Sequence, residues 1–244
     1  MIVEGMTYQE IIKEYNNIWD EARKTTLSKL DPRPYQRFFR KNRMATNVYF
    51  EKIRIKIDSN TYLYAIPVAP NKAFFDKYSV HYTSFLTYFT SKGQYVAMKG
   101  VSRANGEPEF TFYTPHFFDR YRERYLKNAE MEKVDAVMHF MKNNHQESRH
   151  IYHGEYKDYE HHFAGTCNTG MTLGVFLEDK IALYKTFLTR EDLSKNKTDT
   201  MESLDEVYKE REYKFGNLKQ MISSDSTLLN SLRNDPFAIA MLMQ

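Results

Sequence analysis

The sequence predicts an α+β fold, with a mainly antiparallel sheet built from hairpins and with helices on one face and at both ends. Three observations predict this class. Apolar residues recur every three to four positions near the N-terminus, apolar and polar residues alternate in parts of 47–113, and the predicted strands come in pairs joined by short turns. Hairpin pairs form antiparallel sheets, and helices that do not alternate regularly with strands are typical of the α+β class.

The first helices are marked by a cap and by a chain break. Thr7 and Glu10 have the spacing of a capping box, in which a hydroxyl and a carboxylate each accept a backbone N–H at the helix start. Apolar residues at helical spacing then predict an amphipathic helix to about Arg23. The Asp-Pro-Arg-Pro run at 31–34 ends this region, and residues 35–43 predict a short helix with a basic face.

The centre of the chain has the alternation of β-strands. One hairpin is predicted from 48–57 and 61–68 around an Asp-Ser-Asn turn, and a second from 82–90 and 94–101 around Ser-Lys-Gly. A further strand is predicted at 109–113. The next predicted elements are two helices and then three strands, at 115–128, 131–142, 150–154, 171–177 and 180–188.

A polar, lysine-rich stretch at 193–200 is the best domain boundary. We therefore predict one α+β domain over 1–193. It comprises N-terminal helices at 7–43, a β-rich part at 47–113 and a helix-sheet segment at 110–193. Residues 194–244 are predicted to form a helical C-terminal appendage.

Composition excludes several classes of protein. Hydrophobic residues make up 41% of the 244 residues and charged residues 27%, which is typical of a soluble globular chain and not of a disordered one. The single cysteine excludes a disulfide framework and a cysteine zinc ribbon. No apolar stretch approaches the ~20 residues of a membrane span. We expect a cytoplasmic protein that has no membrane contact and no cofactor.

The run Tyr113-Thr-Pro-His-Phe-Phe-Asp-Arg-Tyr-Arg-Glu-Arg carries the main functional argument. Thr114 and Pro115 are favoured at a helix start. His116, Arg120 and Arg124 are then four residues apart and share one face of an α-helix. An imidazole can transfer a proton near neutral pH, and two guanidiniums can hold a phosphate. The alternative is a solvated charged face, on which His116 only caps or stacks.

This motif, Thr-x-His-x3-Arg-x-x-Glu-Arg, is followed by a short helix, a strand and a hairpin that ends at Leu188. The order over about 110–193 resembles small toxin-like modules of bacteria and phages, of the RelE and barnase–EndoU–colicin ribonuclease type. The resemblance implies metal-independent RNA cleavage by attack of a ribose 2′-OH. His116 would be the acid/base, Arg120 and Arg124 would hold the phosphate, and Lys185 and Thr186 would line the site.

Strand geometry limits the part that Lys185 and Thr186 can play. Strict alternation places Lys185 on the side of Phe187 and Thr186 on the side of Tyr184. At most one of the two side chains can therefore join His116. The alternative is that both belong to an ordinary central strand.

A second candidate surface is the basic and aromatic segment near residue 40. Its cations, which we predict to bind nucleic acid, are Arg33, Arg37, Arg40, Lys41 and Arg43. Cations hold phosphates, and exposed aromatic rings stack on bases. The alternative is that Tyr35, Phe38 and Phe39 point inward, which leaves only the cations outside.

Two remaining features give weaker hypotheses. The candidate metal ligands are His150, His153, His161 and His162. In a strand, His150 and His153 point to opposite faces, and so do His161 and His162. We therefore predict no metal site. The Met-rich tail at 237–243 either docks on the core or binds a protein partner.

The sequence therefore leads to two functions of different classes. The first is an RNA-binding or metal-independent RNA-cleaving protein of the toxin-like class. The alternative is a non-catalytic protein-interaction scaffold of phage or mobile-element origin. An enzyme requires His116, Arg120 and Arg124 to converge on an open concave surface, whereas a scaffold would pair both arginines with carboxylates and cover His116.

Overall fold

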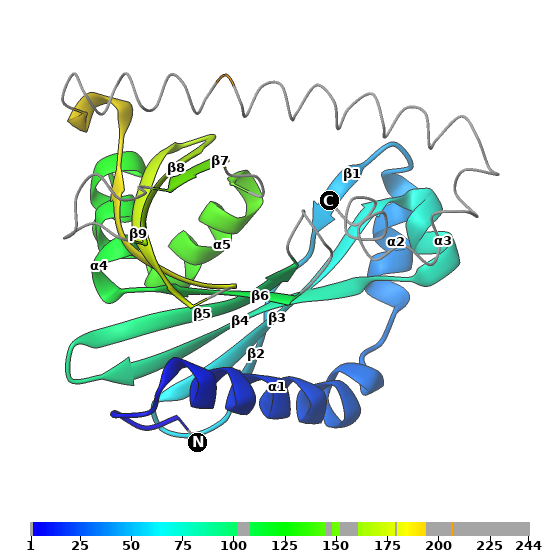
Figure 1. The fold of residues 1–244 in the computed structure, drawn as a ribbon. Coiled ribbons are helices and arrows are strands. Elements are labelled where there is room, and N and C mark those ends of the chain that lie inside the picture. The colour runs from blue at the N-terminus through cyan, green and yellow to red at the C-terminus, as the bar shows by residue number, and fades with distance from the viewer. Residues whose placement is uncertain are drawn as a thin grey trace. The chain divides into compact units, whose positions relative to one another are not determined.

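The computed structural model describes residues 2–101, 108–144, 148–151, 161–178, 180–193 and Glu206 (Figure 1). The described part of the chain divides into two compact units, one formed by residues up to Lys99 and one that begins at Gly100. Helices and mostly antiparallel strand pairs occur in the described part of the chain, so the α+β prediction is confirmed.

The helices of the first unit begin with α1, whose predicted cap is present. Thr7 Oγ1 accepts the backbone N–H of Glu10 at 3.3 Å, and the Glu10 carboxylate accepts the N–H of Thr7 at 2.7 Å. This hydrogen bond from the Thr7 backbone is the main reason that the pKa of Glu10 is lowered. The helices of this unit are α1 (Tyr8–Thr25), η1 (Leu27–Lys29), α2 (Arg33–Lys41) and α3 (Lys72–Tyr78).

The buried side of α1 packs on the strands of the first unit (Figure 1). Its buried residues, Ile11, Tyr15, Ile18 and Ala22, recur at helical spacing. The Tyr15 hydroxyl donates to the Ser84 carbonyl at 3.0 Å and lies 2.8 Å from the Ser84 hydroxyl. Because the Tyr15 side chain is only 1% exposed, this pair fixes α1 on the strand that carries Ser84.

The strands of the first unit form antiparallel neighbours in the order β1-β3-β4-β5, and β2 also pairs with β3. Both predicted hairpins are present, although the predicted strand 48–57 is divided into β1 and β2. The register places Ile55 opposite Leu63 and Leu63 opposite Leu86. The bounds are β1 (Thr46–Tyr49), β2 (Ile53–Lys56), β3 (Thr61–Asn71), β4 (His81–Thr90) and β5 (Gly93–Val101).

The short helix α3 was not predicted from the sequence. Asn71 ends β3 and caps α3, since its side-chain oxygen accepts the N–H of Phe74 at 2.8 Å. Phe75 then packs with Phe39 and Ala69 in a small core.

The strands of the second unit follow the order β6-β10-β9-β8-β7. β6 and β10 are parallel, with Phe112 opposite Leu183, and the other described pairs of this unit are antiparallel. The predicted hairpin of β9 and β10 is present, and β8 is an additional strand. The bounds are β6 (Pro108–Tyr113), β7 (Ser148–Ile151), β8 (His162–Cys167), β9 (Gly170–Glu178) and β10 (Ile181–Leu188).

The helix predicted over 115–128 is shorter and changes its type. It begins as an α-helix and continues as a π-helix, in which the N–H of Leu126 bonds to the carbonyl of Tyr121, five residues earlier. Among the described residues of this unit, the helices are α4 (Pro115–Arg120), η2 (Tyr121–Tyr125), α5 (Lys133–Asn143) and η4 (Arg190–Asp192).

An irregularity in β10 changes which side chains meet the helices. The register shifts between Tyr184, which pairs with Gly174, and Thr186, which pairs with Leu173. Tyr184 and Phe187 both contact Phe117 of α4, with ring centroids at 5.8 and 6.1 Å. The strict alternation predicted for β10 is therefore wrong at Lys185, because a bulge adds a residue there and reverses the side on which Phe187 lies.

Several predictions lie outside the described residues. The proposed appendage 194–244, apart from Glu206, and its tail 237–243 belong to this group, and the domain boundary at 193 stays a prediction. Within the described part, none of the helices combines the length and the apolar character needed to cross a bilayer.

We expect Tyr15→Phe to lower the free energy of unfolding by about 1 kcal/mol, because Ser84 loses its buried partner. Burial raises the pKa of Tyr15 to about 12, above the ordinary value of 10.0. The fold therefore favours the neutral phenol, and this contribution is lost as the pH rises from about 10 to about 12. Urea titrations of both proteins at several pH values would measure this. An equal loss of stability in both proteins over that range would contradict the assignment to Tyr15.

Candidate functional site

The start of α4 is fixed by hydrogen bonds to β10. The Thr114 N–H donates to the Tyr184 carbonyl at 3.0 Å, and the Thr114 hydroxyl donates to the Lys185 carbonyl at 2.9 Å. Thr114 occupies the predicted N-cap position before Pro115, but its hydroxyl bonds to β10 instead of to the helix. The backbone of His116 is therefore placed by the sheet.

His116 and Arg120 are brought together, as their spacing predicts. The Arg120 Nε–H donates to His116 Nε2 at 3.1 Å, and Arg120 Nη1 forms an ion pair with Glu123 at 2.9 Å. Because His116 Nε2 accepts this hydrogen bond, its neutral ring carries the proton on Nδ1. His116 is exposed, so its ring is accessible to a ligand.

Arg124 has different partners from Arg120. Its Nη1 lies 3.4 Å from Asp192 of η4 and 3.5 Å from the Phe187 carbonyl. The prediction of a shared face assumed an α-helix to Arg124, but the π-helix begins at Tyr121 and has more residues in each turn. The structure therefore joins His116 to Arg120 and directs Arg124 to the end of β10.

Lys185 and Thr186 take up different positions at the bulge of β10. The Lys185 side chain is exposed, and its carbonyl accepts the hydroxyl of Thr114. Thr186 is half-buried and pairs with Leu173, which packs with Leu188 away from Phe187. Since Phe187 faces α4, Thr186 is on the opposite side of the sheet from His116. The roles suggested for Lys185 and Thr186 stay predictions.

A second charged group connects α4 with α5. Asp119 Oδ1 lies 2.9 Å from Arg122 Nη2 and 2.9 Å from Lys133 Nζ. Lys133 also donates to the Pro115 carbonyl at 3.1 Å. These contacts hold the helix pair together.

The contact between Tyr121 and His139 was not predicted from the sequence. The Tyr121 hydroxyl lies 3.0 Å from His139 Nδ1, and burial raises the pKa of Tyr121. Burial lowers the pKa of His139 from its ordinary value of 6.5, and the charge of Lys142 acts in the same direction. Tyr121 lies in the helix predicted over 115–128, but no local pattern in the sequence indicates that His139 of α5 meets it.

In the second candidate surface, the aromatic residues of α2 point inward. Phe39 is 1% exposed and stacks on Phe75 at 4.9 Å, while Tyr35 and Phe38 contact Phe50 at 4.6 and 5.3 Å. The alternative in which only the cations remain outside is therefore the arrangement found.

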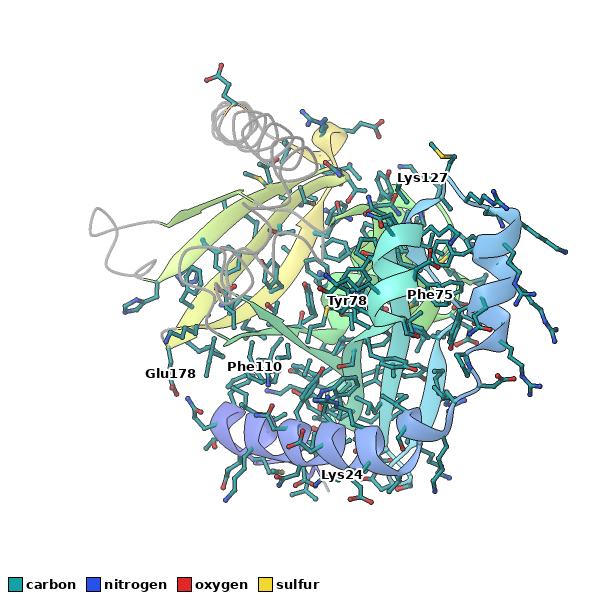
Figure 2. The ribbon with its side chains drawn as sticks, turned by 90° about the vertical axis from the view of Figure 1, so that its right-hand side faces the viewer. Lys24, Phe75, Tyr78, Phe110, Lys127 and Glu178 are labelled. Carbon is teal, nitrogen blue, oxygen red and sulfur yellow. The ribbon has the colours of Figure 1, made fainter. Side chains whose placement is uncertain are left out.

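The cations of this surface differ in their pairing. Arg33 forms an ion pair with Asp31 at 2.8 Å. Arg37, Arg40, Lys41 and Arg43 are exposed, and none of the described carboxylates is within ion-pair distance of them. Figure 2 shows nitrogen-tipped side chains extending outward from α2, next to the helix that carries the labelled Phe75.

The surface is hollowed where α2 ends. Residues 40–45 line a shallow hollow of about 700 Å³ that is widely open to solvent. Its lining includes Arg40, Lys41 and Arg43, so a ligand in this hollow would meet three positive charges.

The histidines offered as metal ligands are not brought together among the described side chains. His161 is exposed and His162 is half-buried, while His153 and the side chain of His150 lie outside the described set. Over the described residues, no three His, Cys, Asp or Glu side chains gather in a way that could hold a metal ion.

Acidification is expected to destabilise the protein partly through His139. The folded chain disfavours the charged ring, so its contribution is complete above about pH 6.5 and is lost as the pH falls through the lowered pKa. His139→Gln should reduce this dependence in thermal unfolding experiments between about pH 7 and pH 5. Part of the dependence should remain, because burial also lowers the pKa of His81. An unchanged pH profile in the variant would contradict the role of His139.

Comparisons with family models, with curated proteins and with solved structures give no match to this chain.

Proposed function

We propose that this protein binds RNA through the exposed cations of α2 and the residues that follow it. The observation that carries this proposal is the concentration of unpaired positive charge on one surface. Residues 29–43 contain six cations and one carboxylate, Asp31. Asp31 is occupied by Arg33, which leaves five cations for a ligand. Four of the five, Arg37, Arg40, Lys41 and Arg43, belong to α2 and the residues that follow it.

Charge pairing distinguishes this surface from the His116 region. Arg120 and Arg124 already contact the carboxylates of Glu123 and Asp192. A phosphate would have to displace those carboxylates, whereas at Arg40 or Lys41 it would displace only water and counterions. Release of counterions drives the association of cationic proteins with nucleic acids. Binding by the α2 surface is therefore favoured over binding at the helix of His116.

RNA is the polymer proposed because of the resemblance of residues 110–193 to ribonuclease modules. That resemblance concerns the second unit, and the cationic surface lies in the first. An RNA ligand, which is a polyanion, accounts both for the resemblance to an RNA-acting module and for the open cationic surface.

Replacing Arg40, Lys41 and Arg43 together by Gln should weaken RNA binding on the order of 100-fold at about 0.1 M salt, since each lost phosphate contact removes several-fold in affinity. Fluorescence anisotropy with a labelled RNA oligonucleotide would measure this. The matched control is Lys13→Gln, Arg23→Gln and Lys24→Gln, which removes three exposed cations from α1. Equal affinities of the two variants would contradict the proposal, and circular dichroism would establish that both are folded.

RNA cleavage at His116 is the second candidate function. It is favoured by the exposure of His116 and by the 3.1 Å contact of its ring with Arg120. In this role Arg120 would leave Glu123 and hold the phosphate, which would free His116 Nε2 to accept a proton. The ion pair of Arg120 with Glu123 is half-exposed, and pairs of this kind contribute little to stability. Replacing the Glu123 carboxylate by a phosphate at Arg120 would therefore cost little free energy.

We expect cleavage of total RNA in the presence of EDTA, and we expect His116→Ala and Arg120→Ala each to abolish it. Arg23→Ala is the control for charge and for purification. Electrophoresis of the RNA would show the result. Equal cleavage by all four proteins would indicate a contaminating nuclease and would contradict a role of His116.

The non-catalytic scaffold remains the alternative of a different class. The carboxylate partners of Arg120 and Arg124 favour it, and the exposure of His116 favours an enzyme. A protein that neither binds nor cleaves RNA in these two experiments would be assigned to the scaffold class.

A further inference from the structure

The packing of α2 determines which part of an RNA this surface can contact. Stacking on bases requires an open aromatic ring. Tyr35 and Phe38 are both directed at Phe50, with Phe38 meeting it edge to face at 5.3 Å, and Phe39 is stacked on Phe75. All three aromatic side chains of α2 are therefore used by the core.

The cations of α2 form one stripe on the opposite side of the helix. At about 100° per residue, Arg33, Arg37, Arg40 and Lys41 fall within about one third of the circumference. The helix rises about 12 Å from Arg33 to Lys41, and about 6 Å over Arg37, Arg40 and Lys41, which have no described carboxylate partner. Arg43 continues the stripe into the hollow at the end of α2. The stripe thus presents guanidinium and ammonium groups at several successive positions.

We propose that this stripe binds the phosphate backbone of double-stranded RNA and does not read its bases. The proposal rests on the RNA-binding function inferred above and specifies its substrate class. A duplex carries about twice the charge of one strand per unit length, so a stripe without stacking rings gains most from a duplex. Double-stranded RNA is also the form that proteins recognise by shape and by phosphate contacts, because side chains do not reach its deep major groove.

Met44 provides an internal test of this substrate class. It lies next to Arg43 and is 91% exposed, and it is the one large apolar side chain lining the hollow at residues 40–45. An exposed methionine can contact a base or wedge between base pairs. A surface that binds only phosphates makes no use of it, so Met44→Ser should leave the affinity unchanged.

The experiment measures binding of the full chain to a labelled RNA duplex, to each of its single strands and to a duplex of different sequence, over a range of salt concentrations. With about four phosphate contacts, the duplex affinity should fall on the order of 100-fold between 50 and 200 mM salt. The two duplexes should bind equally, and each single strand should bind more weakly. Arg40→Gln with Lys41→Gln should lower the salt slope by about 2, whereas Lys13→Gln with Lys24→Gln should leave it unchanged.

Three results would overturn the phosphate-backbone proposal and leave RNA binding itself intact. They are tighter binding of a single strand, a sequence preference that persists at high salt, and a loss of affinity in Met44→Ser. An unchanged salt slope in the Arg40 and Lys41 variant would also overturn it. Absence of binding to every RNA would overturn the proposed function and the substrate class with it.

Discussion

The aromatic contact between α4–η2 and β10 is the constraint on which the His116 region depends. Phe117 and Tyr121 are fully buried and meet Tyr184 and Phe187 edge to face, with Tyr121 and Phe187 at 4.9 Å. This packing fixes the rotation of the helix about its own axis. His116 and Arg120 then have to lie at the exposed margin, so their contact follows from the burial of their neighbours.

The same packing explains why Arg124 does not share a face with His116 and Arg120, although the spacing predicts that it does. The packing of Tyr121 on Phe187 requires Tyr121 to remain buried. The π-helical turn that begins at Tyr121 changes the direction of the side chains that follow. Arg124 is thereby directed to Asp192, which is far from it in the sequence. The helix α2 does not change its type in this way. The spacing of its aromatic and cationic residues places them on opposite sides of a regular α-helix. The helix α4–η2 therefore uses Arg120 and Arg124 within the protein, whereas α2 leaves Arg37, Arg40 and Lys41 without a described carboxylate partner.

Local signals in the sequence predicted local structure well. The capping box of Thr7 and Glu10, the two hairpins of the first unit and the final hairpin are determined by neighbours in the chain. The strand β8 escaped prediction because its sequence, His-Phe-Ala-Gly-Thr-Cys, contains few of the side chains that favour strands. The bulge at Lys185 and the π-helix were also missed, since both depend on packing between distant segments. The candidate site was predictable to the same extent: the contact of His116 with Arg120 follows from spacing, whereas the partner of Arg124 and the contact of Tyr121 with His139 do not.

The π-helix has a consequence for comparing this chain with others. The hydrogen bond from Leu126 to Tyr121 closes a ring that is one residue larger than that of an α-helix. A related chain with an uninterrupted α-helix would therefore carry one residue fewer between Arg120 and Leu126 while keeping the same aromatic contacts. An alignment that forbids a gap there would match Arg124 with a residue on another side of the helix. Spacing alone is thus an unsafe guide to equivalent residues in this segment, and the buried rings are the better reference.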